Sequence, residues 1–172
     1  MSQWSDVYRQ KLTTPEEAVK IVKDGDWIDY GMTTSQPVVL DEALAARKDE
    51  LKDIKVRETM SIYPRHVVED DPNRETFTVM NWHMSGYDRK MAAQGRMNFI
   101  PMCFRNQPLI YRDLIDVDVA MITVAPMDKD GYFNFGLCAA QTESIVKKAK
   151  KVIVEINENM PRCLGGRGEA IH

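Results

Sequence analysis

The chain has 172 residues, of which 44% are hydrophobic and 28% are charged, and its formal net charge is −3. These values are typical of a soluble globular protein of one domain, and they argue against a disordered chain or a basic nucleic-acid-binding face. Because no apolar run approaches the roughly 20 residues that span a bilayer, and the residues after Met1 do not resemble a signal peptide, we expect a cytoplasmic protein that does not bind membranes.

Helical and period-two patterns predict the elements of the first half of the chain. Thr14 can cap a first helix, and Pro15 suits its first position. The next expected elements are a strand over residues 27–30, a loop over 31–37, a helix over 38–48 and a strand over 54–60. Residues 61–73 are rich in polar residues and turn formers, so we expect them to be irregular.

The second half of the chain repeats the alternation of strands and helices. Residues 117–125 are apolar on both faces, as in a central strand of a parallel sheet. The other expected elements are a strand over 77–80, a helix over 86–94, a strand over 97–101, a helix over 106–113 capped by Asn106, a turn over 126–131, a helix over 141–148 and a buried strand over 151–156. This order predicts an α/β fold with a mostly parallel open sheet flanked by helices.

Parallel sheets bind ligands beyond the carboxyl ends of their strands, so the loops that follow strands are the candidate sites. Gly31–Pro37 offers three hydroxyls and an amide, directly before a helix whose start favours negative charge. A thioester oxyanion or a carboxylate would suit it. The alternative is an ordinary turn in which Ser35 caps the helix.

A second glycine-marked loop is Gly131–Gly136, where two glycines enclose three aromatic residues. It predicts a close backbone approach or unusual dihedral angles, and the alternative is a tight aromatic turn in the core. Leu164–Gly168 is interpreted as a surface segment. The acidic pairs Asp41–Glu42 and Asp70–Asp71 are expected to be solvated.

Cysteine and histidine spacing gives no sign of a metal or of a disulfide framework. Three cysteines are far apart in the chain, and we expect three reduced thiols: Cys103, Cys138 and Cys163. His66, His83 and His172 have no spacing typical of a metal site or a catalytic triad. We therefore predict no metal and no tightly bound cofactor.

Four segments taken in order carry a resemblance to a known family. They are residues 18–26, Gly31–Pro37 with its helix, residues 117–136 and residues 152–161. Together they resemble the amino-terminal domain of the acetyl-CoA hydrolase/transferase family, and most of all the butyryl-CoA:acetate and 4-hydroxybutyrate CoA-transferases. The resemblance implies that residues 1–172 are the amino-terminal α/β domain of a two-domain CoA-transferase.

The resemblance also implies a reaction and a division of labour between the domains. CoA passes between a short-chain acyl-CoA (butyryl-, 4-hydroxybutyryl- or acetyl-CoA) and an acid such as acetate, through a ping-pong glutamyl-CoA thioester. The nucleophilic glutamate is expected beyond His172, since Glu155 and Glu169 lack the matching context, so we expect no catalytic residue here. The domain would supply part of the acyl pocket wall through Gly31, Thr33, Thr34, Ser35, Gln36, Pro37, Ser61, Gly136 and Gln141.

Partners follow from the same resemblance. They are the second domain, the acyl-CoA and the carboxylate, in a homo-oligomer of the full-length protein, with CoA as a substrate. We expect the isolated chain to be inactive and to expose an apolar face where the second domain packs. Two alternatives stay open: an acyl-CoA hydrolase on the same scaffold, and a non-catalytic ligand-binding or assembly domain.

Overall fold

A parallel sheet forms the centre of the molecule in the computed structural model, which describes residues 3–165 and 168–172. Among these residues, six strands lie in the order β4-β3-β2-β1-β5-β7, and each neighbouring pair is parallel. The strands are β1 (Trp27–Met32), β2 (Ile54–Thr59), β3 (Phe77–Asn81), β4 (Asn98–Phe99), β5 (Val117–Val124) and β7 (Ala149–Ile156). A separate antiparallel pair joins β6 (Phe133–Asn134) to β8 (Ala170–Ile171).

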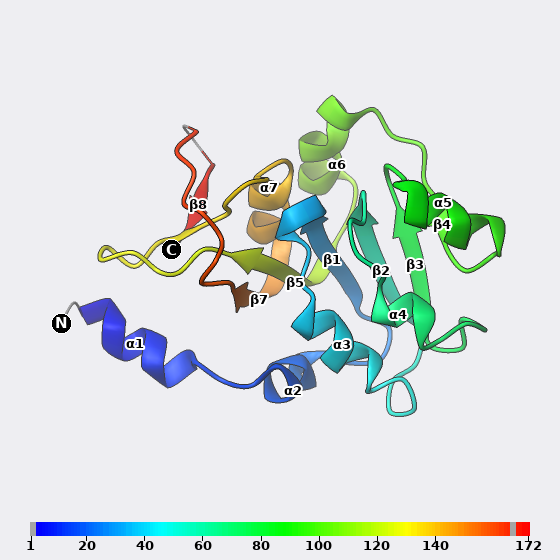
Figure 1. Cartoon of the computed structure of the whole chain (residues 1–172), viewed down its shortest axis with the longest axis horizontal. Helices are drawn as coiled ribbons and strands as arrows, with labels where there is room; N and C mark the ends of the chain where they lie inside the picture. Colours follow the sequence, from blue (N-terminus) through cyan, green and yellow to red (C-terminus); the bar gives the residue numbers. More distant parts are fainter. Residues whose placement is uncertain (1–2, 166–167) are drawn as a thin grey trace.

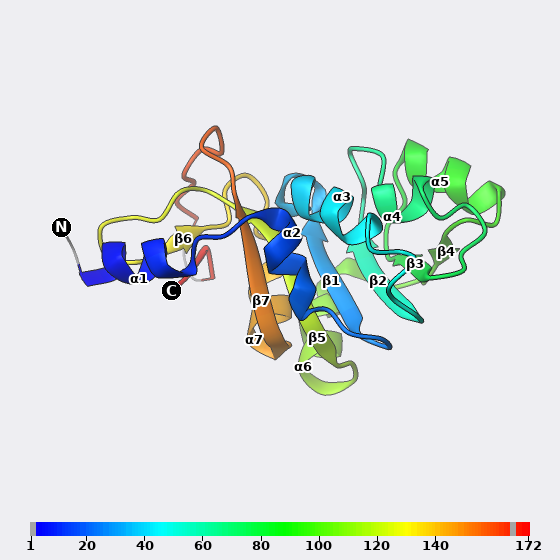
Figure 2. The same ribbon diagram turned by 90° about the horizontal axis from the view of Figure 1, so that it is seen from below.

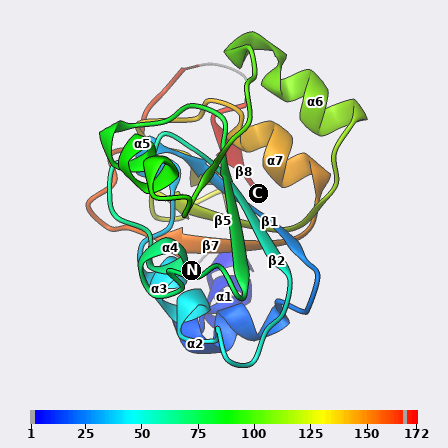
Figure 3. The same ribbon diagram turned by 90° about the vertical axis from the view of Figure 1, so that its right-hand side faces the viewer.

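Helices cover both faces of the sheet (Figure 1). They are α1 (Gln3–Lys11), α2 (Pro15–Ala18), α3 (Val39–Ala45), α4 (His66–Glu69), α5 (Gly86–Ala93), α6 (Gln107–Asp113) and α7 (Thr142–Lys148), with 3-10 turns over Val19–Ile21, Thr33–Ser35 and Phe104–Asn106. Figure 2 shows α2, α3 and α4 on one side of the sheet and α6 and α7 on the other, and Figure 3 shows the same three layers from the end. The predicted α/β fold, a mostly parallel sheet flanked by helices, is confirmed.

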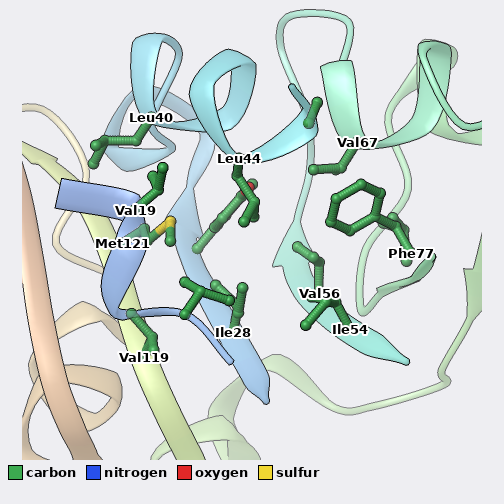
Figure 4. Packing of buried hydrophobic residues seen from close by; sticks show 14 of the residues in the cluster. Val19, Ile28, Leu40, Leu44, Ile54, Val56, Val67, Phe77, Val119 and Met121 are labelled. Carbon is green, nitrogen blue, oxygen red and sulfur yellow. The ribbon is translucent and has the colours of Figure 1, made fainter. Parts of the chain in front are cut away.

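The largest apolar core lies between the sheet and the layer of α2, α3 and α4 (Figure 4). Alternate residues of the strands point into it, while Val19, Leu40, Leu44 and Val67 enter it from the helices. A smaller cluster on the other face joins α6 and α7 to β5 through Tyr111, Ala120 and Ile145. Because both faces of β5 are covered, its eight residues are buried except for Asp118, as expected of a central parallel strand.

Several predicted boundaries are corrected. Gly31 and Met32 continue β1, and the rest of the expected loop begins with a 3-10 turn. The irregular stretch contains α4, and α1 was not expected. The strand expected to be buried, β7, is the sheet edge, with residues 150–152 exposed.

The predicted helix caps have different outcomes. Thr14 does cap α2, because its side chain accepts a hydrogen bond from the Glu17 amide. Asn106 makes no side-chain cap bond. Two residues of the glycine-rich surface segment, 166 and 167, lie outside the described residues.

Gly31 lets the chain turn directly from β1 into the 3-10 turn. A Cβ atom at this position would lie 2.6 Å from Ser35 Cβ and 2.8 Å from the Ser35 carbonyl oxygen. No real side chain fits there without moving the backbone of the turn. The need for glycine at this position is therefore steric.

We predict that Gly31→Ala lowers the free energy of unfolding by about 1–3 kcal/mol, because the added methyl group overpacks the turn. Denaturant titration measures the loss. Gly86→Ala is the matched control, since its Cβ would meet nothing within 4 Å and alanine favours the helix. Equal stability of the two variants would show that the close contact is relieved at no cost.

Candidate functional site

The order of strands reverses at β1, which has β2 on one side and β5 on the other (Figure 1). Strands β2, β3 and β4 follow on one side, and β5 and β7 lie on the other. At such a switch point the loops after the two central strands separate and leave room for a ligand at the carboxyl edge. The loops after β1, β2 and β5 are therefore the candidate site.

Buried hydrogen bonds join these loops to one another. The Gln36 side chain donates to the Thr59 carbonyl oxygen at 3.1 Å, and the Thr123 hydroxyl donates to the Gln36 carbonyl oxygen at 3.0 Å. The Gln141 side chain donates to Thr59 Oγ1 at 3.0 Å. Residues from three separate parts of the sequence thus form one structure around the ends of β1, β2 and β5.

Arg65 and Glu58 form the centre of this network, and both side chains are almost completely buried. The guanidinium of Arg65 donates to the Pro37 carbonyl oxygen at 2.7 Å and to Gln36 Oε1, and its Nε lies 3.3 Å from Glu58 Oε2. Glu58 also accepts from Gln36 Nε2 at 3.2 Å and from Asn81 Nδ2 at 3.3 Å. The Glu58 carboxylate thus lies among N–H groups of Gln36, Asn81 and Arg65, a position that suits a hydrogen-bond acceptor.

Negative charge exceeds positive charge in this cluster. Arg65 acts on both Glu58 and Asp41, while Asp88 acts on Glu58, so three carboxyl groups and one guanidinium gather here. Burial raises the pKa of Glu58 to about 7, Arg65 opposes the rise, and Asp88 and Asp41 add to it. Burial likewise raises the pKa of Asp41, which accepts from the Tyr30 hydroxyl at 3.0 Å. A carboxyl group that titrates near neutral pH is a common mark of a functional site.

Backbone strain is concentrated in the same loops. Outside glycine, five described residues have positive φ, and three of them lie in the site: Thr33 (49°), Met60 (54°) and Ala140 (39°). The left-handed region costs a residue with a Cβ about 1–2 kcal/mol. Such conformations persist where the surroundings impose them, and they cluster at binding sites and active sites. Gly131 and Gly136 also have positive φ, so the unusual dihedral angles predicted for their loop are confirmed.

The start of α3 is already occupied by a carboxylate of the protein itself. Glu155 accepts the main-chain amides of Val38, Val39 and Leu40 at 2.9–3.1 Å. The amides expected to receive a thioester oxyanion are therefore bound to Glu155. The Ser35 cap is wrong, since the Ser35 hydroxyl donates to the Cys138 carbonyl oxygen instead.

The predicted site residues lie in the three loops, although most of their side chains face the protein interior. Exposure is 2% or less for Ser35, Gln36, Ser61 and Gln141. Thr33 and Thr34 are partly exposed, and Gly31, Pro37 and Gly136 are buried. The Ser61 amide donates to Asp88 at 3.0 Å, which ties the loop after β2 to α5. Several of these side chains thus join the loops to one another, and which of the predicted residues contact a ligand stays a prediction.

Sequence reasoning missed Glu58, Arg65 and Asn81. A signal for Glu58 exists in the alternation of β2, because Ile54 and Val56 are core residues and Glu58 follows on the same face. A charged residue at a core position needs a partner.

The expectation that Asp41 and Asp71 are solvated is wrong, since they are 1% and 7% exposed. Three main-chain amides donate to Asp71, which holds the turn before β3.

An apolar groove of about 600 Å³ borders the site between α1 and β7. Its lining includes Leu12, Val39, Val152 and Glu155, and the first three are exposed.

In the part of the chain that the structure describes, no three His, Cys, Asp or Glu side chains are grouped to hold a metal ion. No described helix is long and apolar enough to cross a membrane.

These features define an α/β domain with a candidate small-ligand site at the switch point of a parallel sheet. The sequence profile described as acetyl-CoA hydrolase/transferase N-terminal domain matches residues 1–172. The chain therefore belongs to this family, and the resemblance found in the sequence is confirmed.

Relatives and solved structures agree with this assignment. The chain is 45% identical to the butyryl-CoA:acetate CoA-transferase of Anaerostipes caccae, over 98% of this chain and 38% of the relative. It is 37% identical to the succinyl-CoA:cyclohexane-1-carboxylate CoA transferase of Geobacter metallireducens, over 92% of this chain and 36% of the relative. RipA from Yersinia pestis is similar in structure, with a TM-score of 0.88 and 28% identity over 99% of this chain and 42% of RipA. The chain thus spans less than half the length of these proteins.

Proposed function

We propose that this chain is the amino-terminal domain of a CoA-transferase that moves CoA between a short-chain acyl-CoA and a carboxylic acid such as acetate. The observation that carries the proposal is the 45% identity to a butyryl-CoA:acetate CoA-transferase over 98% of the chain. The site supports it, because the loops after β1, β2 and β5 converge at a sheet switch point. The 4-hydroxybutyrate CoA-transferase of Clostridium kluyveri, 30% identical, is a further relative of this class.

In this proposal the domain shapes the acyl pocket, and a glutamate in a second domain forms the covalent CoA thioester. The wall consists of the 3-10 turn at Thr33–Ser35, the strained Met60 with Ser61, and the segment from Gly136 to Gln141. Their partly exposed groups, such as Thr33 and Thr34, would face the acyl chain. The buried hydrogen bonds below them keep the wall rigid, so that it presents a preorganised surface to the acyl group.

The second domain would account for the greater length of the relatives. The groove between α1 and β7 is the surface on which we expect it to pack, because exposed Leu12, Val39 and Val152 lie there beside the end of β7. Since the nucleophile would belong to that domain, we expect the isolated chain to have no turnover.

The test is CoA transfer by the full-length protein of which this chain is the amino-terminal part. With butyryl-CoA and acetate, acetyl-CoA should form, and free thiol should appear only slowly. Trapping by borohydride should label one glutamate outside residues 1–172. Thiol release that is independent of acetate would replace the transferase by a hydrolase, and turnover by the isolated chain would contradict the division between two domains.

A further inference from the structure

The position of the Gly31–Pro37 segment depends on side chains that lie below it, on β2 and at the start of α4. Gln36 is held at both ends of its amide: Nε2 donates to Glu58 and to the Thr59 carbonyl oxygen, and Oε1 accepts from Arg65. Arg65 also holds the Pro37 carbonyl oxygen at 2.7 Å. Two neighbouring residues of the segment are thus fixed by one buried ion pair.

The Glu58 carboxylate orients this arrangement, because it faces donors from three elements. Gln36 approaches from the loop after β1, Asn81 from β3 and Arg65 from the turn before α4. The charged groups that face Glu58 are Arg65, Asp41 on α3 and Asp88 on α5. Gln36 Nε2 and Arg65 Nε both lie beside Glu58 Oε2, so removing this acceptor would leave two buried N–H groups without it and would loosen the link between Gln36 and Arg65.

We infer that Glu58 is a positioning residue of the acyl pocket: through Gln36 and Arg65 it fixes the Gly31–Pro37 wall against which the acyl group binds. The inference rests on the proposed function for the identity of the ligand. Its structural part stands on the contacts alone. Glu58 itself does not touch the substrate, since its side chain is 1% exposed and enclosed by protein groups.

The first measurement uses the 172-residue chain at pH 8, where the carboxylate is ionised. Glu58→Gln places an amide N–H among donors, so amide hydrogen exchange at residues 33–36 should rise about tenfold. Glu58→Asp keeps the charge and should restore part of the protection. Asp29→Asn is the matched control: Asp29 is a buried carboxylate paired with Arg57 on the other face of the sheet, and its loss should leave these amides unchanged.

The second measurement uses the full-length transferase. Glu58→Gln should raise the KM for butyryl-CoA about tenfold with a much smaller change in kcat, because the wall binds the acyl group without taking part in the chemistry. Gln36→Met removes the link while leaving Glu58 and Arg65 in place. It should reproduce both effects if Glu58→Gln does not fold.

Each outcome decides a separate point. Unchanged exchange at residues 33–36 in Glu58→Gln and Gln36→Met would overturn the inference. Faster exchange with an unchanged KM in an active transferase would overturn its connection to the acyl pocket. A wild-type protein that transfers no CoA would refute the proposed function, while the exchange result would still report on the role of Glu58 in the wall.

Discussion

Arg65→Met should lower the free energy of unfolding by about 3–5 kcal/mol at pH 8, because it leaves buried carboxylates without their cation. Arg65 is 1% exposed and contacts Glu58, Gln36 and the Pro37 carbonyl oxygen. Methionine fills much of the same volume, so the loss is electrostatic and not a cavity effect. At pH 5 the loss should be smaller, since uncompensated carboxyl groups take up protons instead of remaining charged.

Urea titration of wild type and variant at both pH values measures this difference. Arg112→Met is the control. Arg112 forms an exposed ion pair with Asp113, so this substitution should hardly change the free energy of unfolding. The double variant Arg65→Met/Glu58→Gln should be more stable than Arg65→Met alone, because it also removes the Glu58 carboxylate that has lost its cation. A loss at pH 8 no larger than that of the control would show that Arg65 is not the counterion of the cluster.

The sheet could be predicted from the sequence because each strand carries its own apolar pattern. The buried β5 is the clearest case, and alternation marks β2. The extension of β1 through Gly31 could not be predicted, since glycine and hydroxyl residues suggest a loop. In the structure, Met32 pairs with Thr59 of β2, so pairing with the neighbouring strand extends β1 past Gly31. Likewise, α1 is held by contacts distant in sequence, such as Trp4 with His172.

The sequence indicates which loops meet at the candidate site, but it does not indicate the partners of their side chains. Polar residues after a strand indicate the carboxyl edge, but nothing local distinguishes a group that meets ligand from one that meets a buried partner. Gln36 illustrates the limit, because its partners Glu58 and Arg65 lie 22 and 29 residues away. Asp41 illustrates it too: beside Glu42 it suggests a solvated pair, but the Tyr30 hydroxyl donates to it inside the protein.

Wild-type stability should fall by about 3 kcal/mol relative to Glu58→Gln as the pH rises from about 4.5 to about 7 and above. Burial raises the pKa of Glu58 from 4.5 in the reference state to about 7 in the folded protein. Between these values the unfolded chain has released the proton while the folded protein retains it, so raising the pH favours unfolding. Below about 4.5 both states hold the proton, and above about 7 both have lost it, so the difference is then constant.

Urea titrations of both proteins between pH 4 and pH 8 test this prediction. The difference between them isolates Glu58, because the other titrating groups are shared, including His66, whose pKa the Asp70 carboxylate raises. A constant difference across this range would show that Glu58 has the same pKa in the folded and the unfolded protein. Together, the two predictions for Glu58→Gln distinguish the effect of Glu58 on stability from its effect on the position of the Gly31–Pro37 wall. At pH 8 the glutamine variant is relieved of a buried charge, yet its Gly31–Pro37 wall should exchange faster. A carboxylate that weakens the fold while it orders a loop of the candidate site serves that site, which is the pattern expected of residues at functional positions.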